Sequence, residues 1–425
     1  MASQSEPLLG TADIAEPEVR EWVLLENRAR ELFARYGYGE LRTPVIERTD
    51  VFVRGLGDET DVVKKEMYTF EDRGGRSVTL RPEGTAGVMR AIANQGLAEG
   101  EERRVFYLGP MFRGERPAAG RRRQFHQVGV EAVGRASPLL DAECIAMLLH
   151  FLESVGIPDG ELLLNTRGSA EDRPVAAAAL KEYFAPRLAG LCEDCRRRFE
   201  TNVWRMLDCK VEGCQETILG APAVTNLLGP ESTAYFAAVR RCLDSLGVRY
   251  RVEPRLVRGL DYYEHTVFEV VHGGLGAQNA LAGGGRYALY LPGNDRPLRG
   301  VGFAAGLERL LLARASLGQA AAEAAGMDAY LVSLGERALA ASQALAMELR
   351  RAGLRVLADT AGRSMKAQMR SADKARSRFT LIRGDTELDG GTVQCKDMAA
   401  GTQEAVPAAA VTAWLQSRLR PGGTE

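Results

Sequence analysis

Residues 106–134 read FYLGPMFRGERPAAGRRRQFHQVGVEAVG, and the expected fold is organised around this stretch. We expect two strands, 111–115 and 124–133, joined by a basic loop over 116–123 in which Pro117 and Gly120 supply turn residues. Side chains two positions apart share one face of a strand, so Arg113 lies beside Glu115 on the first strand.

The second strand separates a polar face from an apolar one. The polar face carries an aromatic ring, an amide, a glycine and a carboxylate, namely Phe125, Gln127, Gly129 and Glu131. The mostly apolar face carries His126, Val128, Val130 and Ala132. The polar set suits a small polar ligand lying on a sheet beside an aromatic platform, although alternation alone favours a solvated amphipathic hairpin.

Composition limits the class of protein. The 425 residues are 45% hydrophobic and 26% charged, which predicts a globular chain of two domains. The net charge of -1 means that any nucleic-acid site must be a local basic patch. The chain has no apolar run of membrane-spanning length, and its start MASQSEPLLG lacks the features of a signal peptide. Without a secretory signal, its seven cysteines indicate a reducing compartment and not a disulfide framework. We expect a cytoplasmic protein that does not enter a membrane.

Several motifs together carry a family resemblance. FRGERPAAGRRRQFHQ at 112–127 resembles the second signature motif of class II aminoacyl-tRNA synthetases, in the form found in histidyl-tRNA synthetases. TDVVKKEMYTF at 60–70 and RGLDYY at 258–263 are typical of that family, and GVGFAAGLERL at 300–310 resembles the third class II motif. The resemblance covers nearly the whole chain. It implies an α/β protein: an α+β catalytic domain with an antiparallel sheet at 1–325, an insertion at about 170–236, and a smaller α/β anticodon-binding domain at 327–425.

Other elements follow from periodicity. A helix is expected over 16–36, with an apolar stripe that includes Trp22, Val23 and Phe33, followed by a strand over 40–46 that contains Pro44. This pair resembles the first class II motif, which forms the dimer interface in the family and so implies a homodimer; a core helix and an edge strand would show the same pattern. Turns and short strands are expected over 50–72, and further helices over 86–94 and 137–155.

The resemblance also implies the substrates and the residues that bind them: ATP with Mg²⁺, L-histidine and tRNA(His). Arg113 and Arg258 are implied as the catalytic residues, on either side of the α-phosphate. The histidine site is implied to be Glu83, Thr85, Gln127, Glu131, Tyr262 and Tyr263. The ATP site is implied to be Arg113, Glu115, Arg121, Phe125 and Arg309.

Each of these roles has a simpler structural alternative. Glu83 and Thr85 precede the helix at 86–94, where they would serve as a dipole partner and a cap. Neutral imidazole has one donor and one acceptor, which Glu131 and Tyr263 would match; otherwise Glu131 is a salt-bridge partner and Tyr263 a core ring. The glycine run at 282–287, AGGGRY, fits neither nucleotide-binding glycine pattern, and we expect it to be a loop beside the bound amino acid.

The insertion contains four cysteines in two short-spaced pairs, Cys192 with Cys195 and Cys209 with Cys214. Structural zinc is possible, but the loose second spacing favours reduced structural thiols. The nearby basic residues are Arg196, Arg197, Arg198, Arg205 and Lys210. They form either a contact with the acceptor arm of tRNA or a solvated charged run.

From residue 327 a β-α-β-α-β order is expected, with Lys366, Arg370 and Lys374 along one helix face. Two other functions stay open: a paralogue that regulates ATP phosphoribosyltransferase, and a non-catalytic module that binds tRNA or senses histidine. Retention of Arg113, Arg309 and the C-terminal domain argues against the regulatory paralogue. Histidine-dependent pyrophosphate exchange separates both alternatives from a synthetase.

Overall fold

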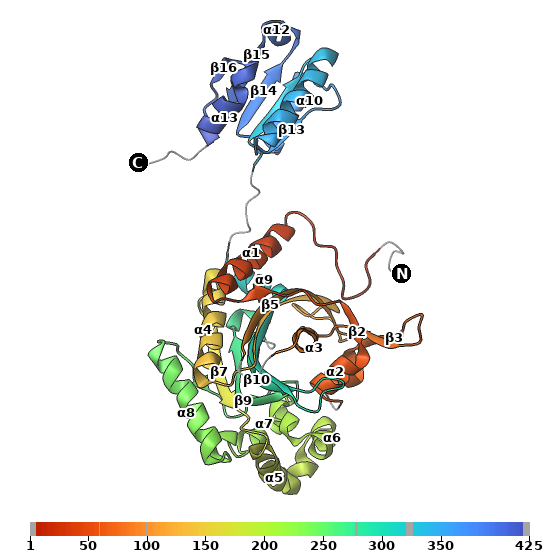
Figure 1. Ribbon diagram of the computed structural model, residues 1–425, viewed down its shortest axis with the longest axis vertical. Helices are drawn as coiled ribbons and strands as arrows, with labels where there is room; N and C mark the ends of the chain where they lie inside the picture. Colours follow the sequence, from red (N-terminus) through yellow and green to blue (C-terminus); the bar gives the residue numbers. More distant parts are fainter. Residues whose placement is uncertain (1–5, 59, 98–100, 277–278, 320–325, 420–425) are drawn as a thin grey trace. The chain divides into compact units, whose positions relative to one another are not determined.

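The computed structural model describes residues 6–58, 60–97, 101–276, 279–319 and 326–419. The chain divides into two compact units, Met1–Ala322 and Glu323–Glu425, which are described separately (Figure 1). The expected α/β class, with a large antiparallel sheet and a separate C-terminal α/β unit, is confirmed.

An eight-stranded sheet forms the centre of the larger unit. Its strands in spatial order are β1 (Gly39–Glu40), β5 (Arg103–Phe112), β6 (Gln124–Val133), β11 (Leu298–Gly306), β10 (Ala280–Leu289), β9 (Tyr263–Val271), β7 (Glu161–Thr166) and β8 (Arg251–Val252). All neighbours are antiparallel except the two edge pairs, β1 with β5 and β7 with β8. Short strands at both edges limit the exposed hydrogen-bonding backbone.

One face of this sheet is covered by α1 (Val19–Arg35), α4 (Pro138–Ser154), α8 (Pro230–Ser245) and α9 (Leu307–Ser316). Val128, Val130 and Ala132 are completely buried against these helices, so the apolar face expected for the second strand is confirmed. Of the stripe expected on α1, Trp22 and Phe33 are buried, but Val23 is 49% exposed and the prediction for Val23 was wrong. Val23 lies outside the arc of α1 that contacts the sheet.

The opposite face of the sheet is only partly covered. There α2 (Thr49–Leu56) and α3 (Thr85–Gln95) pack with a three-stranded sheet of β2 (Ile46–Arg48), β4 (Ser77–Leu80) and β3 (Tyr68–Glu71) (Figure 1). A second apolar cluster joins α2 and α3 to Tyr107 and Met111 of β5 and to Val133 of β6. The polar side chains of β6 point toward this face beyond the cluster.

The central hairpin differs from expectation at its first strand. β6 has the expected bounds, but β5 starts earlier, at Arg103, and ends at Phe112, so Arg113 and Glu115 lie in the connecting loop. The strand ends there because Gly114 donates its backbone N–H to Glu66, outside the hairpin, at 2.6 Å. The loop therefore starts three residues earlier than the alternation indicated.

Two other predictions in the first hundred residues were wrong. The strand expected over 40–46 is two short strands, β1 and β2, in different sheets. Pro44 has no N–H to donate to a β-ladder. Before it, Leu41 donates its backbone N–H to the carbonyl of Phe106 in the large sheet at 2.8 Å. After it, the carbonyl of Val45 accepts the backbone N–H of Arg81, next to β4 of the small sheet, at 2.9 Å. The segment expected as turns and short strands begins with a helix, α2, because Val51, Phe52 and Leu56 form one buried helical face.

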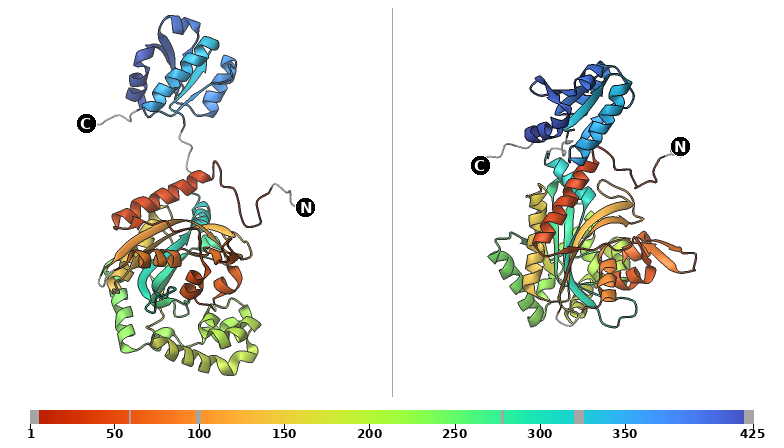
Figure 2. Two further views of the ribbon diagram at one scale, coloured as in Figure 1. Left: turned by 45° about the vertical axis from the view of Figure 1, so that its right-hand side comes forward. Right: turned by 45° about the horizontal axis from the view of Figure 1, so that its top comes forward.

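Short helices make up most of the insertion: α5 (Asp172–Phe184), η2 (Ala185–Gly190), α6 (Glu193–Thr201), η3 (Val203–Asp208), α7 (Glu212–Leu219) and η4 (Val224–Asn226). They gather at one end of the larger unit and share an apolar cluster of their own (Figures 1 and 2). The next helix, α8, packs instead on α4 and belongs to the main core.

The smaller unit is a five-stranded sheet in the order β13 (Val356–Ala358), β12 (Ala329–Ser333), β14 (Phe379–Arg383), β15 (Thr392–Asp397) and β16 (Gln403–Pro407). Its helices are α10 (Glu336–Arg351), α11 (Met365–Lys374), α12 (Asp385–Asp389) and α13 (Val411–Leu419). The first three strands are parallel, as the expected β-α-β-α-β order requires, while β15 and β16 extend the sheet antiparallel.

The Ala/Glu-rich sequence over 313–325 predicts a linker helix or a spacer. The structure has α9 ending at Ser316, and positions 320–325 lie outside the described residues. Within the described ranges, no helix combines the length and the apolar character needed to cross a membrane.

Candidate active site

Two connected cavities lie on the partly covered face of the large sheet. The smaller has a volume of about 160 Å³ and is lined by all six residues assigned to histidine: Glu83, Thr85, Gln127, Glu131, Tyr262 and Tyr263. The larger has a volume of about 950 Å³ and is lined by all five residues assigned to ATP: Arg113, Glu115, Arg121, Phe125 and Arg309. Arg113, Gln127, Arg258, Gly283 and Ala304 line both cavities and mark where they meet.

Glu131 lies at the closed end of the smaller cavity. It is almost completely buried, and its two carboxylate oxygens accept hydrogen bonds from the hydroxyls of Thr85 and Tyr287, each at 2.7 Å. Burial raises the pKa of Glu131 to about 8, although the hydrogen bonds from Tyr287 and Thr85 act in the opposite direction. Among the described residues, no cation pairs with Glu131, so the alternative in which Glu131 is a salt-bridge partner was wrong.

Glu83 connects the same cavity to the start of α3. Its carboxylate accepts the backbone N–H groups of Thr85 and Ala86, each at 2.8 Å, so Glu83 caps the helix. The structural alternative, in which Thr85 is the cap, was wrong, because Gly84 holds the N-cap position and Thr85 is the first residue of α3. Burial raises the pKa of Glu83. The carboxylate and the Thr85 hydroxyl also face the cavity, so capping the helix does not prevent them from contacting a ligand.

Glycines make room for the large polar side chains around the cavity. A Cβ on Gly129 would lie 2.4 Å from the Tyr107 ring, and one on Gly84 would lie 2.2 Å from the same ring. A Cβ on Gly302 would lie 2.0 Å from Glu131 Oε2. No side chain fits at these contact distances, so the positions of Tyr107 and Glu131 depend on glycine at these positions.

RGLDYY contributes Arg258 to the junction of the cavities and Tyr262 and Tyr263 to the smaller cavity. The rings of Tyr262 and Tyr263 have centroids 4.7 Å apart, and burial raises the pKa of Tyr263. Arg258 pairs with Glu269 of β9, and its guanidinium occupies the space where a side chain at Gly283 would be, 2.5 Å from an added Cβ. The glycine run therefore gives space to an arginine.

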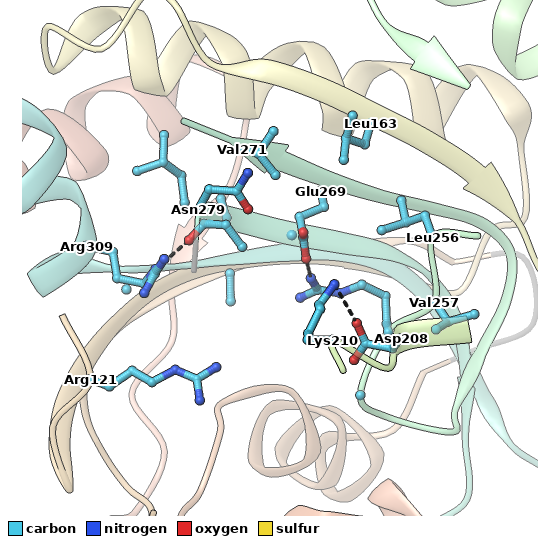
Figure 3. A pocket seen from close by; sticks show the side chains of 18 of the residues that line it. Arg121, Leu163, Asp208, Lys210, Leu256, Val257, Glu269, Val271, Asn279 and Arg309 are labelled. Carbon is cyan, nitrogen blue, oxygen red and sulfur yellow. Dashed lines mark hydrogen bonds and ion pairs between the residues drawn. The ribbon is translucent and has the colours of Figure 1, made fainter. Parts of the chain in front are cut away.

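Arginines from the β5–β6 loop and from α9 line the larger cavity. Arg113 donates Nε–H to the carbonyl of Pro82 at 2.8 Å, and its guanidinium carbon lies 5.3 Å from the centroid of Phe125. Arg121 pairs with Glu115 at 2.8 Å. Arg309 donates to the carbonyl of Ala280 (Figure 3). Burial and the nearby charge of Arg121 lower the pKa of Arg309, and both arginines line the same cavity.

Gln127 lies where the two cavities meet, and its side-chain oxygen is free to accept a hydrogen bond. Its Oε1 is buried and has no hydrogen-bond partner among the described residues. Buried polar atoms are normally paired, so an unpaired acceptor facing a cavity indicates a donor brought by a ligand or by water.

Comparison with known proteins gives two family matches. The family described as histidyl-tRNA synthetase matches residues 10–310, which is more than half of the chain. The chain belongs to the histidyl-tRNA synthetase family. As a member it is a class II aminoacyl-tRNA synthetase, a ligase that uses ATP to join histidine to tRNA. The family described as anticodon binding domain matches residues 328–418.

Individual relatives match along almost their full length. A histidine–tRNA ligase from Solidesulfovibrio magneticus is 48% identical over 417 residues, covering 97% of each chain. One from Moorella thermoacetica is 47% identical over 415 residues, covering 97% of this chain and 98% of its own. The crystal structure of apo S. aureus histidyl-tRNA synthetase superposes with a TM-score of 0.80 at 36% identity, covering 97% of this chain and 99% of that one.

Sequence reasoning did not assign several residues that line the smaller cavity, among them Tyr287 and Gly302. It expected the AGGGRY segment to be a loop, whereas the segment lies in β10, paired with β9 and β11, and that expectation was wrong. Glycines are needed in this strand because Arg258 and Phe268 occupy the space that side chains at Gly283 and Gly284 would fill. Had the segment been read as a strand, alternation would have placed Gly283 and Tyr287 on the same face, which is the face that lines the smaller cavity.

The basic residues of the insertion are largely paired. Arg197 contacts Asp194 at 2.6 Å and Lys210 contacts Asp208 at 3.2 Å (Figure 3). Arg205 contacts Asp61 at 3.4 Å. These partners make the insertion less basic than its sequence indicated.

Proposed function

We propose that the chain activates L-histidine with ATP to give histidyl-adenylate and pyrophosphate, and then transfers histidine to the 3′ end of tRNA(His), using the two connected cavities as its active site. The observation that carries this assignment is that Arg113 and Arg258 line both cavities. A histidine in the smaller cavity and ATP in the larger one would bring carboxylate and α-phosphate together at these two cations.

The mechanism follows from charge. The histidine carboxylate is already ionised at neutral pH, so it attacks the α-phosphate without a general base. The two anions repel each other, and charge builds on the α-phosphate as pyrophosphate leaves. Arg113 and Arg258 offset this repulsion from fixed positions, because the Pro82 carbonyl and Glu269 hold their side chains.

Histidine is proposed to bind with its imidazole toward Glu131. A bound imidazole would favour the ionised form of Glu131, and an ionised carboxylate has more acceptor sites than the two that Thr85 and Tyr287 occupy, so Glu131 would also accept the imidazole N–H. The Tyr263 hydroxyl would donate to the bare ring nitrogen. Glu83, Thr85 and the unpaired Gln127 Oε1 would accept from the α-ammonium group.

ATP is proposed to bind in the larger cavity with its adenine on Phe125 and the exocyclic amine at Glu115. Arg121 and Arg309 would face the outer phosphates, where the phosphate charge would relieve the repulsion between the two guanidiniums. Mg²⁺ prefers phosphate and carboxylate oxygens, and Glu269 supplies a carboxylate on the cavity wall. The metal would neutralise phosphate charge.

Each part of the chain is proposed to have its own role: catalysis in 1–325, with the insertion at about 170–236, and anticodon binding in 327–425. Lys366, Arg370 and Lys374 are exposed on α11 of the smaller unit and would contact tRNA phosphates. A homodimer is proposed because Ile46, Tyr68 and Phe70 leave 48%, 36% and 45% of their surface exposed on the small sheet. The proposed compartment is the cytoplasm.

The deciding test is exchange of labelled pyrophosphate into ATP with purified full-length protein. Exchange that depends on histidine supports the proposal. A regulatory paralogue or a non-catalytic binding module would show none, and exchange driven equally by other amino acids would contradict the assignment of histidine.

A truncation tests the division of labour. Removing 327–425 should leave histidine-dependent exchange largely intact, because every residue lining the two cavities lies in the larger unit. Charging of tRNA should fall strongly. Loss of exchange in a truncated protein that is folded by circular dichroism would show that the smaller unit is needed for activation.

A further inference from the structure

The four cysteines of the insertion come together although they are separated in sequence. Cys192 immediately precedes α6 and Cys195 is the third residue of that helix. Cys209 follows η3, and Cys214 is the third residue of α7. Their four sulfur atoms all lie within 4.8 Å of one another, and all except Cys192 are buried.

The distances match a metal site better than a disulfide. A tetrahedral zinc ion with Zn–S bonds of about 2.3 Å holds its sulfurs about 3.8 Å apart. Cys192 Sγ and Cys209 Sγ are 3.8 Å apart, whereas a disulfide requires about 2.05 Å. The loose spacing of the second pair, which argued against zinc in the sequence, is compatible with this geometry because both pairs converge at the starts of two helices. We propose that Cys192, Cys195, Cys209 and Cys214 bind one structural Zn²⁺ ion.

The surroundings suit anionic sulfur. Cys192 donates its backbone N–H to Cys214 Sγ at 3.3 Å, and Val211 donates to Cys209 Sγ at 3.4 Å. Such donors orient sulfur ligands and stabilise their negative charge. Cys195 and Cys214 also lie in the first turns of α6 and α7, where helix dipoles favour negative charge.

Zinc would stabilise a region with a small core. The apolar cluster of the insertion draws nearly all its residues from one stretch between Ala176 and Val224 and includes three of the four cysteines. Small cores of this kind are commonly reinforced by a metal or disulfides. Four reduced thiols packed together would make no strong bond to one another, so they would add little to the stability of this small core.

The site also adjoins the catalytic cavities. Asn202 donates to Asp261, within RGLDYY, at 2.9 Å, and Arg205 contacts Asp61 at 3.4 Å. Cys209 and Lys210 line the larger cavity. Zinc would therefore hold the insertion as a fixed wall of the cleft, and its loss would loosen contacts to the loop that carries Arg258.

The test is the metal content of full-length protein purified without chelator. We expect about one zinc ion per chain by mass spectrometry of metals. Replacing zinc with Co²⁺ should produce the visible absorption of a tetrahedral thiolate site. The Cys192→Ser/Cys195→Ser variant should lose at least about tenfold in zinc content, whereas Cys242→Ser, a cysteine outside the cluster, should keep its zinc.

A measurement on the unmodified protein guards against variants that do not fold. Strong chelation of wild-type protein should release the zinc, make four further thiols reactive and speed proteolysis within 190–220. Wild-type protein that contains less than about one zinc per ten chains after growth in zinc-supplemented medium, with all cluster thiols already reactive, would overturn the proposal. So would intact masses showing two disulfides, or zinc retained in the double variant.

Discussion

Tyr287 donates its hydroxyl to Glu131 at 2.7 Å across an intervening strand of the central sheet. Tyr287 lies on β10 and Glu131 on β6, and β11 runs between them. The two side chains meet above β11 because Gly300 and Gly302 carry no side chains; an added Cβ would lie 2.6 Å from Tyr287 Oη and 2.0 Å from Glu131 Oε2, respectively. The carboxyl group of Glu131 in the smaller cavity is therefore fixed before any substrate binds.

Recognition of imidazole is the first property that this arrangement predicts. Glu131→Ala and Tyr263→Phe should each lower kcat/KM for histidine by about 100-fold or more, because each leaves one ring nitrogen without a partner in a buried site. The Michaelis constant for ATP should change little. The measurement is pyrophosphate exchange across a range of histidine concentrations.

Tyr290→Phe is the matched control for that experiment, since Tyr290 is 48% exposed and outside both cavities. It should behave like the wild type. Near-normal histidine kinetics in both Glu131→Ala and Tyr263→Phe would mean that the imidazole is recognised by other groups, with Tyr287 the next candidate.

Arg113 is predicted to be essential for adenylate formation. Arg113→Ala should slow pyrophosphate exchange by about 100- to 1,000-fold, because a fixed cation at the developing phosphate charge is removed. The neighbouring Arg116 is exposed and lies outside both cavities, so Arg116→Ala should keep near-wild-type exchange. Equal rates in the two variants, with both folded by circular dichroism, would refute the role of Arg113.

The sequence predicted the parts of the site that depend on local pattern. Strand alternation placed Gln127 and Glu131 on one face of β6 and Val128 on the other, and the strand has the expected bounds. The motifs identified eleven side chains, besides Arg258, that line the two cavities. Local pattern succeeds here because a shift of register by one residue would move the apolar side chains of β6 from the helix-covered face to the cavity face.

Contacts between distant strands could not be predicted in this way. Tyr287 and Glu131 are 156 positions apart, and their contact depends on the strand order β6-β11-β10. Likewise, β5 ends before Arg113, and the next residue, Gly114, bonds to Glu66, a tertiary contact that overrides alternation. The four insertion cysteines converge through helix packing, which spacing alone does not report.

A buried ion pair predicts a large effect on stability away from the cavities. Asp141 of α4 and Arg286 of β10 are both completely inaccessible, with Arg286 Nε donating to Asp141 Oδ1 at 2.9 Å. Asp141→Ala should lower the free energy of unfolding by about 3–5 kcal/mol, because the Arg286 charge is left buried without its partner. Urea denaturation followed by circular dichroism measures the change.

An exposed pair in the same unit is the control. Glu31 pairs with Arg28 at 3.1 Å with both side chains about half exposed, and Glu31→Ala should cost at most about 1 kcal/mol. If both substitutions changed the free energy of unfolding by similar small amounts, Arg286 would have to find another partner or solvent, and the buried pair would not be a structural requirement.

The pKa of Glu131 predicts how stability depends on pH. Burial raises this pKa from its ordinary value of 4.5 to about 8. Between these two values the folded protein holds a proton that the unfolded chain has released, so the contribution of Glu131 to stability is complete below about pH 4.5 and is lost as pH rises toward 8. The decline should be on the order of 4 kcal/mol, since one pKa unit corresponds to about 1.4 kcal/mol.

Glu131→Gln isolates this effect, because glutamine keeps the shape of the side chain and cannot ionise. The free energy of unfolding of the variant, measured in urea between about pH 5 and pH 8, should increase relative to the wild type as pH rises. Glu31→Gln, at an exposed position, should follow the wild type at every pH. A constant difference between Glu131→Gln and wild type over this range would mean that Glu131 ionises in the folded protein at an ordinary pKa, with its charge stabilised by the hydroxyls of Thr85 and Tyr287 despite burial.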